Sequence, residues 1–249
     1  MTRQFHNALN RMALFTALLL VGLILFYAPF LRIAAANVLL NGIIIGTTVF
    51  GIGLCFVEIF KLLPEYKWAR AYFSGRKRVA LPPRLLRPVA LILRARPVRI
   101  SGTTLNGMLE MILNRFEDSR ESVRYITNTL IFLGLLGTFW GLILTVGGFA
   151  DLIGALDFSD ESVLQNMQAG LTRPLSGMAT AFTSSLMGLA GSLAVGFLGL
   201  QVQLAQNAIF REVEDYLSAH TSVATTDTVA TVLPQINDNL RQIKNTVTQ

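Results

Sequence analysis

The chain has 249 residues, of which 52% are hydrophobic and only 14% are charged, and its mean hydropathy is +0.52. This composition excludes an intrinsically disordered chain and is typical of an integral membrane protein. The net charge of +6 does not by itself indicate nucleic-acid binding, because Lys and Arg also flank membrane helices. The single cysteine, Cys55, has no partner for a disulfide within the chain.

Four apolar stretches are long enough to cross a hydrocarbon core about 30 Å thick, which takes about 20 helical residues. They are residues 12–31, 38–57, 126–150 and about 178–200, and none contains Asp, Glu, Lys, Arg or His. The sequence Ala34-Ala35-Ala36 resembles a signal-peptide cleavage site, but the first stretch is longer than a signal peptide's apolar region, so we expect a retained helix. The predicted fold is an all-α integral membrane protein with four transmembrane helices.

Most of the 21 Lys and Arg residues lie between Lys61 and Arg124. The positive-inside rule therefore places both termini and the 61–125 segment in the cytoplasm. The connections on the outside are then a tight turn at 32–37 and a segment at 151–177, for which we expect a short interfacial helix with Ser159 as its N-cap. Pro174 interrupts the chain before the last span.

Four regions follow from these patterns. Residues 1–63 hold the first pair of transmembrane helices, and residues 64–104 form a basic cytoplasmic loop whose prolines favour short helices and turns. Residues 105–217 hold transmembrane helices 3 and 4 with long cytoplasmic extensions, because apolar residues recur at helical spacing from Leu105 to Phe116 and from Leu204 to Leu217. Residues 218–249 form a cytoplasmic amphipathic tail, in which two heptads fit either a coiled coil or a plain amphipathic helix.

Small and hydroxylated residues recur on one face of the third and of the fourth stretch. Two functions fit this pattern: close packing of membrane helices, or a polar lining for water or ions. The candidate ion-pathway residues are Thr138, Thr145, Thr180, Thr183 and Ser184. The candidate helix-packing residues are Gly134, Gly137, Gly141 and Gly188.

An ion path of this kind also needs a titratable or ion-coordinating group, and the four apolar stretches contain no carboxylate or histidine. Glu58 lies at the end of the second stretch, where pairing with Lys61 explains it better than ion transport. The proton carrier is therefore either absent or supplied by another chain.

Two motifs resemble the MotA/TolQ/ExbB proton-channel family. They are Gly134-Leu-Leu-Gly-Thr-Phe-Trp-Gly141 in the third stretch and the Ala179-Thr180-Ala181 segment about 40 residues later in the fourth. The similarity covers residues 105–217. The resemblance implies an inner-membrane homopentamer around two copies of a single-span partner of the MotB/TolR/ExbD type. In that family the Asp of the partner carries the proton, and the complex of the two proteins, called a stator, converts proton motive force into movement.

The resemblance also implies roles for individual residues. Thr138 and Thr180 match the family's pore threonines, and Gly134, Gly137 and Gly141 match positions of close helix packing. The TolQ and ExbB branches have a Glu where this chain has Leu175, which puts that residue's role in doubt. The four-span topology resembles the flagellar stator branch, but the basic loop lacks a clear match to that branch's rotor-contacting charges.

Other functions have less support in the sequence. A non-conducting tetraspan scaffold that oligomerises through its small residues remains an alternative, as does a sodium-driven version of the same motor. A transporter would show broken helices or an internal repeat, which we do not find. The absence of a metal cluster, a nucleophile with its base or a phosphate loop argues against an enzyme, and we expect no cofactor and no nucleic-acid partner.

Overall fold

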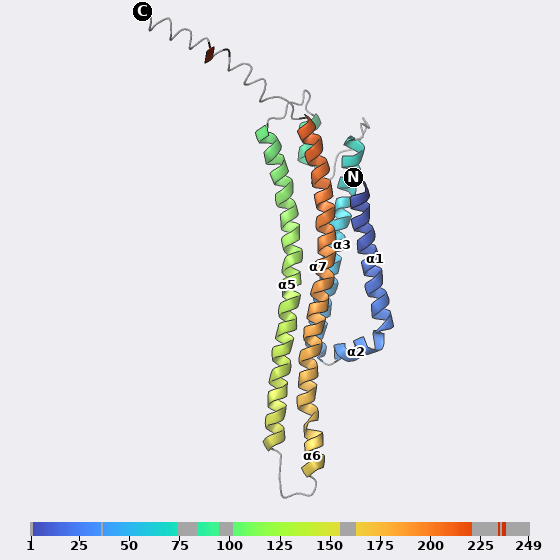
Figure 1. The fold of residues 1–249 in the computed structure, drawn as a ribbon, viewed down its shortest axis with the longest axis vertical. Coiled ribbons are helices and arrows are strands. Elements are labelled where there is room, and N and C mark those ends of the chain that lie inside the picture. Colours follow the sequence, from blue (N-terminus) through green and yellow to red (C-terminus); the bar gives the residue numbers. More distant parts are fainter. Residues whose placement is uncertain are drawn as a thin grey trace, which may run out of the picture. The chain divides into compact units, whose positions relative to one another are not determined.

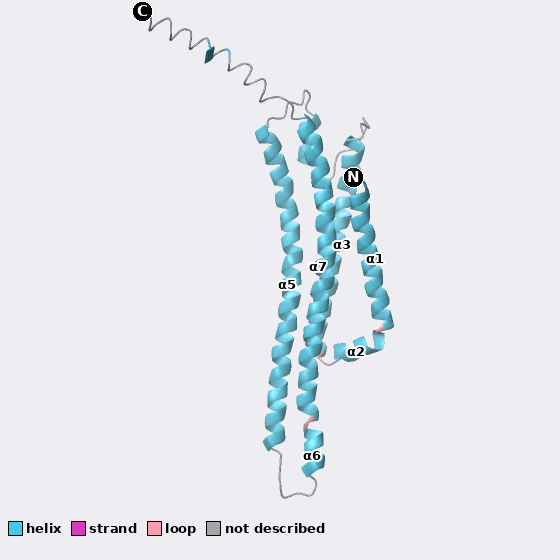
Figure 2. Cartoon of the chain, viewed as in Figure 1, coloured by secondary structure: helices cyan, strands magenta, loops and turns pink. Residues whose placement is uncertain are grey.

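The computed structural model describes residues 2–35, 37–73, 84–94, 102–154 and 163–220, together with residues 234, 236 and 237 of the tail. All elements in these ranges are α-helices, as Figure 2 shows. Four of the helices are long and apolar enough to cross a membrane. This confirms the predicted all-α fold with four candidate transmembrane helices. The predicted N-cap Ser159, residues 74–83 and 95–101 of the basic loop, and most of the tail lie outside the described residues.

The helices follow one another along the chain as drawn in Figure 1. Their bounds are α1 (Thr2–Leu25), α2 (Tyr27–Ala35), α3 (Val38–Phe73), α4 (Arg87–Arg94), α5 (Gly102–Gly154), α6 (Val163–Gly170) and α7 (Thr172–His220). The chain divides into two compact units, which we describe separately. The first unit comprises residues 1–61 and 117–206, and the second comprises residues 62–116 and 207–249.

Two prolines set where helices break. Pro29 has no N–H for the carbonyl of Leu25, and α1 ends at Leu25. Pro174 has no N–H for the carbonyl of Gly170, and α6 ends at Gly170. The prediction of one helix over 12–31 followed by a tight turn at 32–37 was therefore wrong, because α2 occupies residues 27–35. The predicted short helix within 151–177 is present as α6.

The long helices α5 and α7 confirm that the third and fourth apolar stretches continue as unbroken helices into amphipathic extensions. Helix α3 continues past the second apolar stretch and through Pro64 to Phe73. Leu62, Tyr66 and Ala69 are buried at helical spacing in this part of α3. Their packing stabilises the helix and offsets the one backbone hydrogen bond that Pro64 does not form.

Helix α3 runs parallel to α7 within the first unit. Asn41 contacts Ser184, Thr48 lies against Gly191, and the Cys55 thiol lies 4.0 Å from the carbonyl oxygen of Val195. These contacts place the start of α3 level with Ser184. Helix α7 begins 12 residues earlier, at Thr172, which corresponds to about 18 Å of helix. Helices α5 and α7 therefore continue past the level at which α3 begins.

The carboxylate of Glu65 holds the start of α4 in the second unit. Its two oxygens accept hydrogen bonds from the backbone N–H groups of Leu85 (2.7 Å) and Leu86 (3.2 Å). These amides precede the first helical residue, Arg87, so Glu65 supplies a cap from a different helix. Glu65 and Leu86 are buried, so no water takes the place of this carboxylate.

Replacing Glu65 with Ala should loosen the start of α4. The half-buried amide of Leu85 and the buried amide of Leu86 would lose their acceptors, at a cost of about 1–3 kcal/mol for the buried one. We expect faster hydrogen exchange in residues 84–94, measured by mass spectrometry on the purified protein. The control is Glu58→Ala on the same helix, which removes only the pair with the exposed Lys61. Equal exchange in the two variants would exclude the capping role of Glu65.

Candidate functional site

The two motifs singled out in the sequence lie against each other in the first unit. On α5 the glycines at 134, 137 and 141 are buried and face α7, where Gly177, Ala181 and Gly188 are also buried. A Cβ added at Gly141 would lie 2.5 Å from the backbone nitrogen of Ala181. One added at Gly188 would lie 2.7 Å from the Cα of Gly134. The helix backbones therefore touch along this face, which we call the glycine seam.

All four predicted helix-packing residues lie in the glycine seam. Gly137 faces the Cβ atom of Ser184, and no side chain at position 137 would fit without displacing it. Close approach of this kind increases van der Waals contact between helices where no hydrophobic effect favours association. The positions of Gly134, Gly137, Gly141 and Gly188 are those of close contact between α5 and α7 within one chain.

Three of the five predicted ion-pathway residues are buried inside the subunit. The Thr145 hydroxyl donates to the carbonyl oxygens of Gly141 (2.8 Å) and Pro174 (3.3 Å), which joins α5 to α7. The Thr180 hydroxyl donates to the carbonyl oxygen of Ser176 at 3.0 Å, one turn back along α7. The Ser184 side chain is fully buried. These hydroxyls are satisfied by protein atoms, as buried polar groups must be.

The other two predicted residues, Thr138 and Thr183, are half-buried. The Thr138 hydroxyl donates to the carbonyl oxygen of Leu135 at 2.6 Å, and the Thr183 hydroxyl donates to that of Thr180 at 3.1 Å. A threonine hydroxyl has one hydrogen to donate and two lone pairs. Because the hydrogen is directed to the helix backbone, each oxygen keeps its two lone pairs as hydrogen-bond acceptors.

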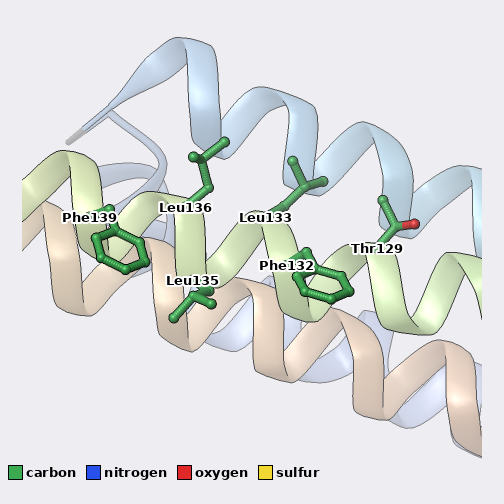
Figure 3. Close-up of a pocket in the computed structure, with 6 residues that line it drawn as sticks. All are labelled: Thr129, Phe132, Leu133, Leu135, Leu136 and Phe139. Atoms are coloured by element: carbon green, nitrogen blue, oxygen red, sulfur yellow. The ribbon is translucent and has the colours of Figure 1, made fainter.

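Helix α5 has a shallow apolar groove on its exposed face, shown in Figure 3. Its volume is about 350 Å³, and its lining side chains form two rows along the helix. The lining residues are Thr129, Phe132, Leu133, Leu135, Leu136 and Phe139. Trp140 continues the exposed apolar surface, with 52% of the residue exposed. This surface suits lipid or an apolar helix and has no place for a charged ligand.

Asn41 on α3 is a buried polar residue that the sequence patterns did not identify. Its side-chain oxygen accepts a hydrogen bond of 2.8 Å from the hydroxyl of Ser184, and both residues are fully buried. The available signal was a lone amide in the second apolar stretch, because an amide inside a membrane span is costly unless it is hydrogen-bonded. The expected pairing of Glu58 with Lys61 is present at 2.8 Å.

The fold and this site place the chain in the class of all-helical proteins with four helices long and apolar enough to cross a membrane. Two of these helices, α5 and α7, pack together along the glycine seam. Among the described residues, no group of three or more His, Cys, Asp or Glu is placed to hold a metal ion. No protein-family model, curated protein or solved structure matches the chain.

Proposed function

We propose that this protein is the multi-span subunit of an ion-driven motor of the MotA/TolQ/ExbB type. Five copies surround two copies of a single-span partner in the bacterial inner membrane, with both termini in the cytoplasm, and proton flow moves the partner against the ring. The observation that supports this best is the glycine seam. It brings the two family-like motifs, about 40 residues apart in sequence, into backbone contact.

The partner supplies the proton carrier in this proposal. The four apolar stretches contain no Asp, Glu, Lys, Arg or His, whereas Thr138 lies half-buried on the helix whose apolar face is exposed. A single-span apolar helix fits against that face, and a carboxylic acid on it meets the Thr138 hydroxyl. The membrane potential then drives each proton with about 2.3 kcal/mol per 100 mV.

The hydrogen-bond direction at Thr138 sets what it does to the carrier. Its hydrogen is donated to the carbonyl oxygen of Leu135, so its oxygen accepts a hydrogen bond. A protonated carboxylic acid can donate to that oxygen, whereas a carboxylate cannot. Thr138 therefore stabilises the neutral form of the partner's Asp, which is also the form that is less costly to bury as it moves to the next subunit.

A second candidate function is a non-conducting scaffold. The observation that favours it is that Thr145, Thr180 and Ser184 are buried and bonded within the subunit, as packing residues are. In this case the exposed face of α5 is covered by other copies of the chain, and no ion crosses.

Gentle purification from the native membrane distinguishes the two functions. The motor predicts a native mass of five copies plus two copies of a single-span polypeptide with an Asp in its span, identified by mass spectrometry. A homo-oligomer that retains no such polypeptide after cross-linking would favour the scaffold. Proton uptake by vesicles that contain the purified complex, in sodium-free buffer, separates a proton-driven motor from a sodium-driven one.

A further inference from the structure

The hydrogen bond between Asn41 and Ser184 lies where three helices of the first unit meet. Ser184 is on α7, Asn41 is on α3, and Ser184 also fills the space beside Gly137 of α5. Leu40 of α3 approaches the same glycine, at 3.0 Å from the position of an added Cβ. All three helices therefore contribute to this junction, and α3 does so with both Leu40 and Asn41.

The junction is next to the residues proposed to act on the proton carrier. Thr138 follows Gly137 on α5, and Thr180 is one turn before Ser184 on α7. Only four residues of α3 reach this level, since α3 begins at Val38, and beyond it α5 and α7 continue without α3. The Asn41–Ser184 hydrogen bond thus joins α3 to α7 at the end of α3 that lies nearest Thr138 and Thr180.

We propose that Asn41 is a positioning residue for ion transfer, which fixes α7 against α3 so that Thr138 and Thr180 keep their places relative to the partner's carboxyl group. This inference rests on the proposed motor function. Apolar contacts between α3 and α7 are not directional. A hydrogen bond between two fully buried polar groups has a defined geometry, and breaking it has a high free-energy cost.

Serine 184 has an alternative partner, which makes the test selective. In Asn41→Leu the Ser184 hydroxyl can bond back to the carbonyl oxygen of Ala181, three residues earlier on α7, as the Ser192 hydroxyl does to Leu189. No polar group is then left unpaired on α7, so assembly should persist while the tie between α3 and α7 is lost. In Ser184→Ala the same tie is removed from the other side.

The test measures proton uptake, with a pH-sensitive dye, in vesicles that contain the complex purified with its co-purifying partner. We expect Asn41→Leu and Ser184→Ala each to lower the flux per assembled complex about fivefold, as the loss of one buried hydrogen bond implies. The double variant should lose no more than either single one. Ser184→Cys, which keeps a weaker donor of nearly the same size, should recover part of the flux.

The matched control is Ser192→Ala. Ser192 is also buried on α7, but its hydroxyl donates to the carbonyl oxygen of Leu189 in its own helix, so its loss should leave the flux unchanged. Additive losses, or a loss in Ser192→Ala as large as in Ser184→Ala, would overturn the positioning role. Full flux in Asn41→Leu together with blocked conduction in Thr138→Val would also overturn the positioning role. The proposed motor function would be unaffected by this outcome. A wild-type complex that moves neither protons nor sodium would overturn both.

Discussion

Replacing Thr138 with Val, or Thr180 with Val, should reduce proton flux through the purified complex by at least about tenfold. A rise of about 1.4 kcal/mol in the free-energy barrier of the proton-transfer step is sufficient for a tenfold loss. Valine has almost the shape of threonine and lacks the hydroxyl. At Thr138 the change removes the acceptor proposed for the partner's carboxyl group. At Thr180 it removes the buried hydroxyl bonded to Ser176, behind the half-buried Thr183. Native mass should stay unchanged in both variants.

Thr127→Val is the matched control for Thr138, because Thr127 lies on the same helix and does not line the apolar groove. The Thr127 hydroxyl donates to the carbonyl oxygen of Val123 at 2.9 Å, so the substitution removes the same kind of bond eleven residues away. Its flux should equal that of the wild type. If all three variants conduct normally, Thr138 and Thr180 are packing residues, and their proposed role in proton transfer is excluded.

Replacing Gly141 or Gly188 with Ala should cause the largest loss of stability among single substitutions in the first unit. The added methyl group at Gly141 meets the backbone nitrogen of Ala181, and at Gly188 it meets the backbone of Gly134 and Leu130. A backbone atom cannot rotate away as a side chain does, so α5 and α7 must separate. Overpacking costs about 1–3 kcal/mol and in this geometry more, because neighbouring seam contacts are lost as well.

Thermal unfolding in a mild detergent, followed by the loss of native mass, measures this effect. Gly147→Ala on α5 and Gly46→Ala on α3 are the controls, because an added Cβ meets nothing within 4 Å at either position. These controls should be neutral or more stable by about 0.5–1 kcal/mol, since Ala is the better helix former. A midpoint for Gly141→Ala at or above that of Gly147→Ala would contradict the glycine seam as the main contact between α5 and α7.

The sequence by itself determined the number and type of the long helices. Crossing a bilayer requires a continuous apolar helix, so four uncharged stretches were sufficient to predict four candidate spans. The periodic apolar residues from Leu105 to Phe116 also predicted that α5 extends beyond its apolar stretch, and Met108, Ile112 and Phe116 are buried there. Glycine spacing predicted the packing faces, because small residues on one helix side permit close approach.

The tertiary structure decided which hydroxyl faces which neighbour. Periodicity places Thr138, Thr180 and Ser184 on helix faces, but a helix face has no preferred partner until other helices pack on it. Packing buried Ser184 against Asn41 and Gly137 and left Thr138 half-exposed, and no local pattern distinguishes the two. Helix ends depended on tertiary packing in the same way. Pro29 and Pro174 coincide with breaks, whereas Pro64 lies inside α3 because the buried residues around it stabilise the helix.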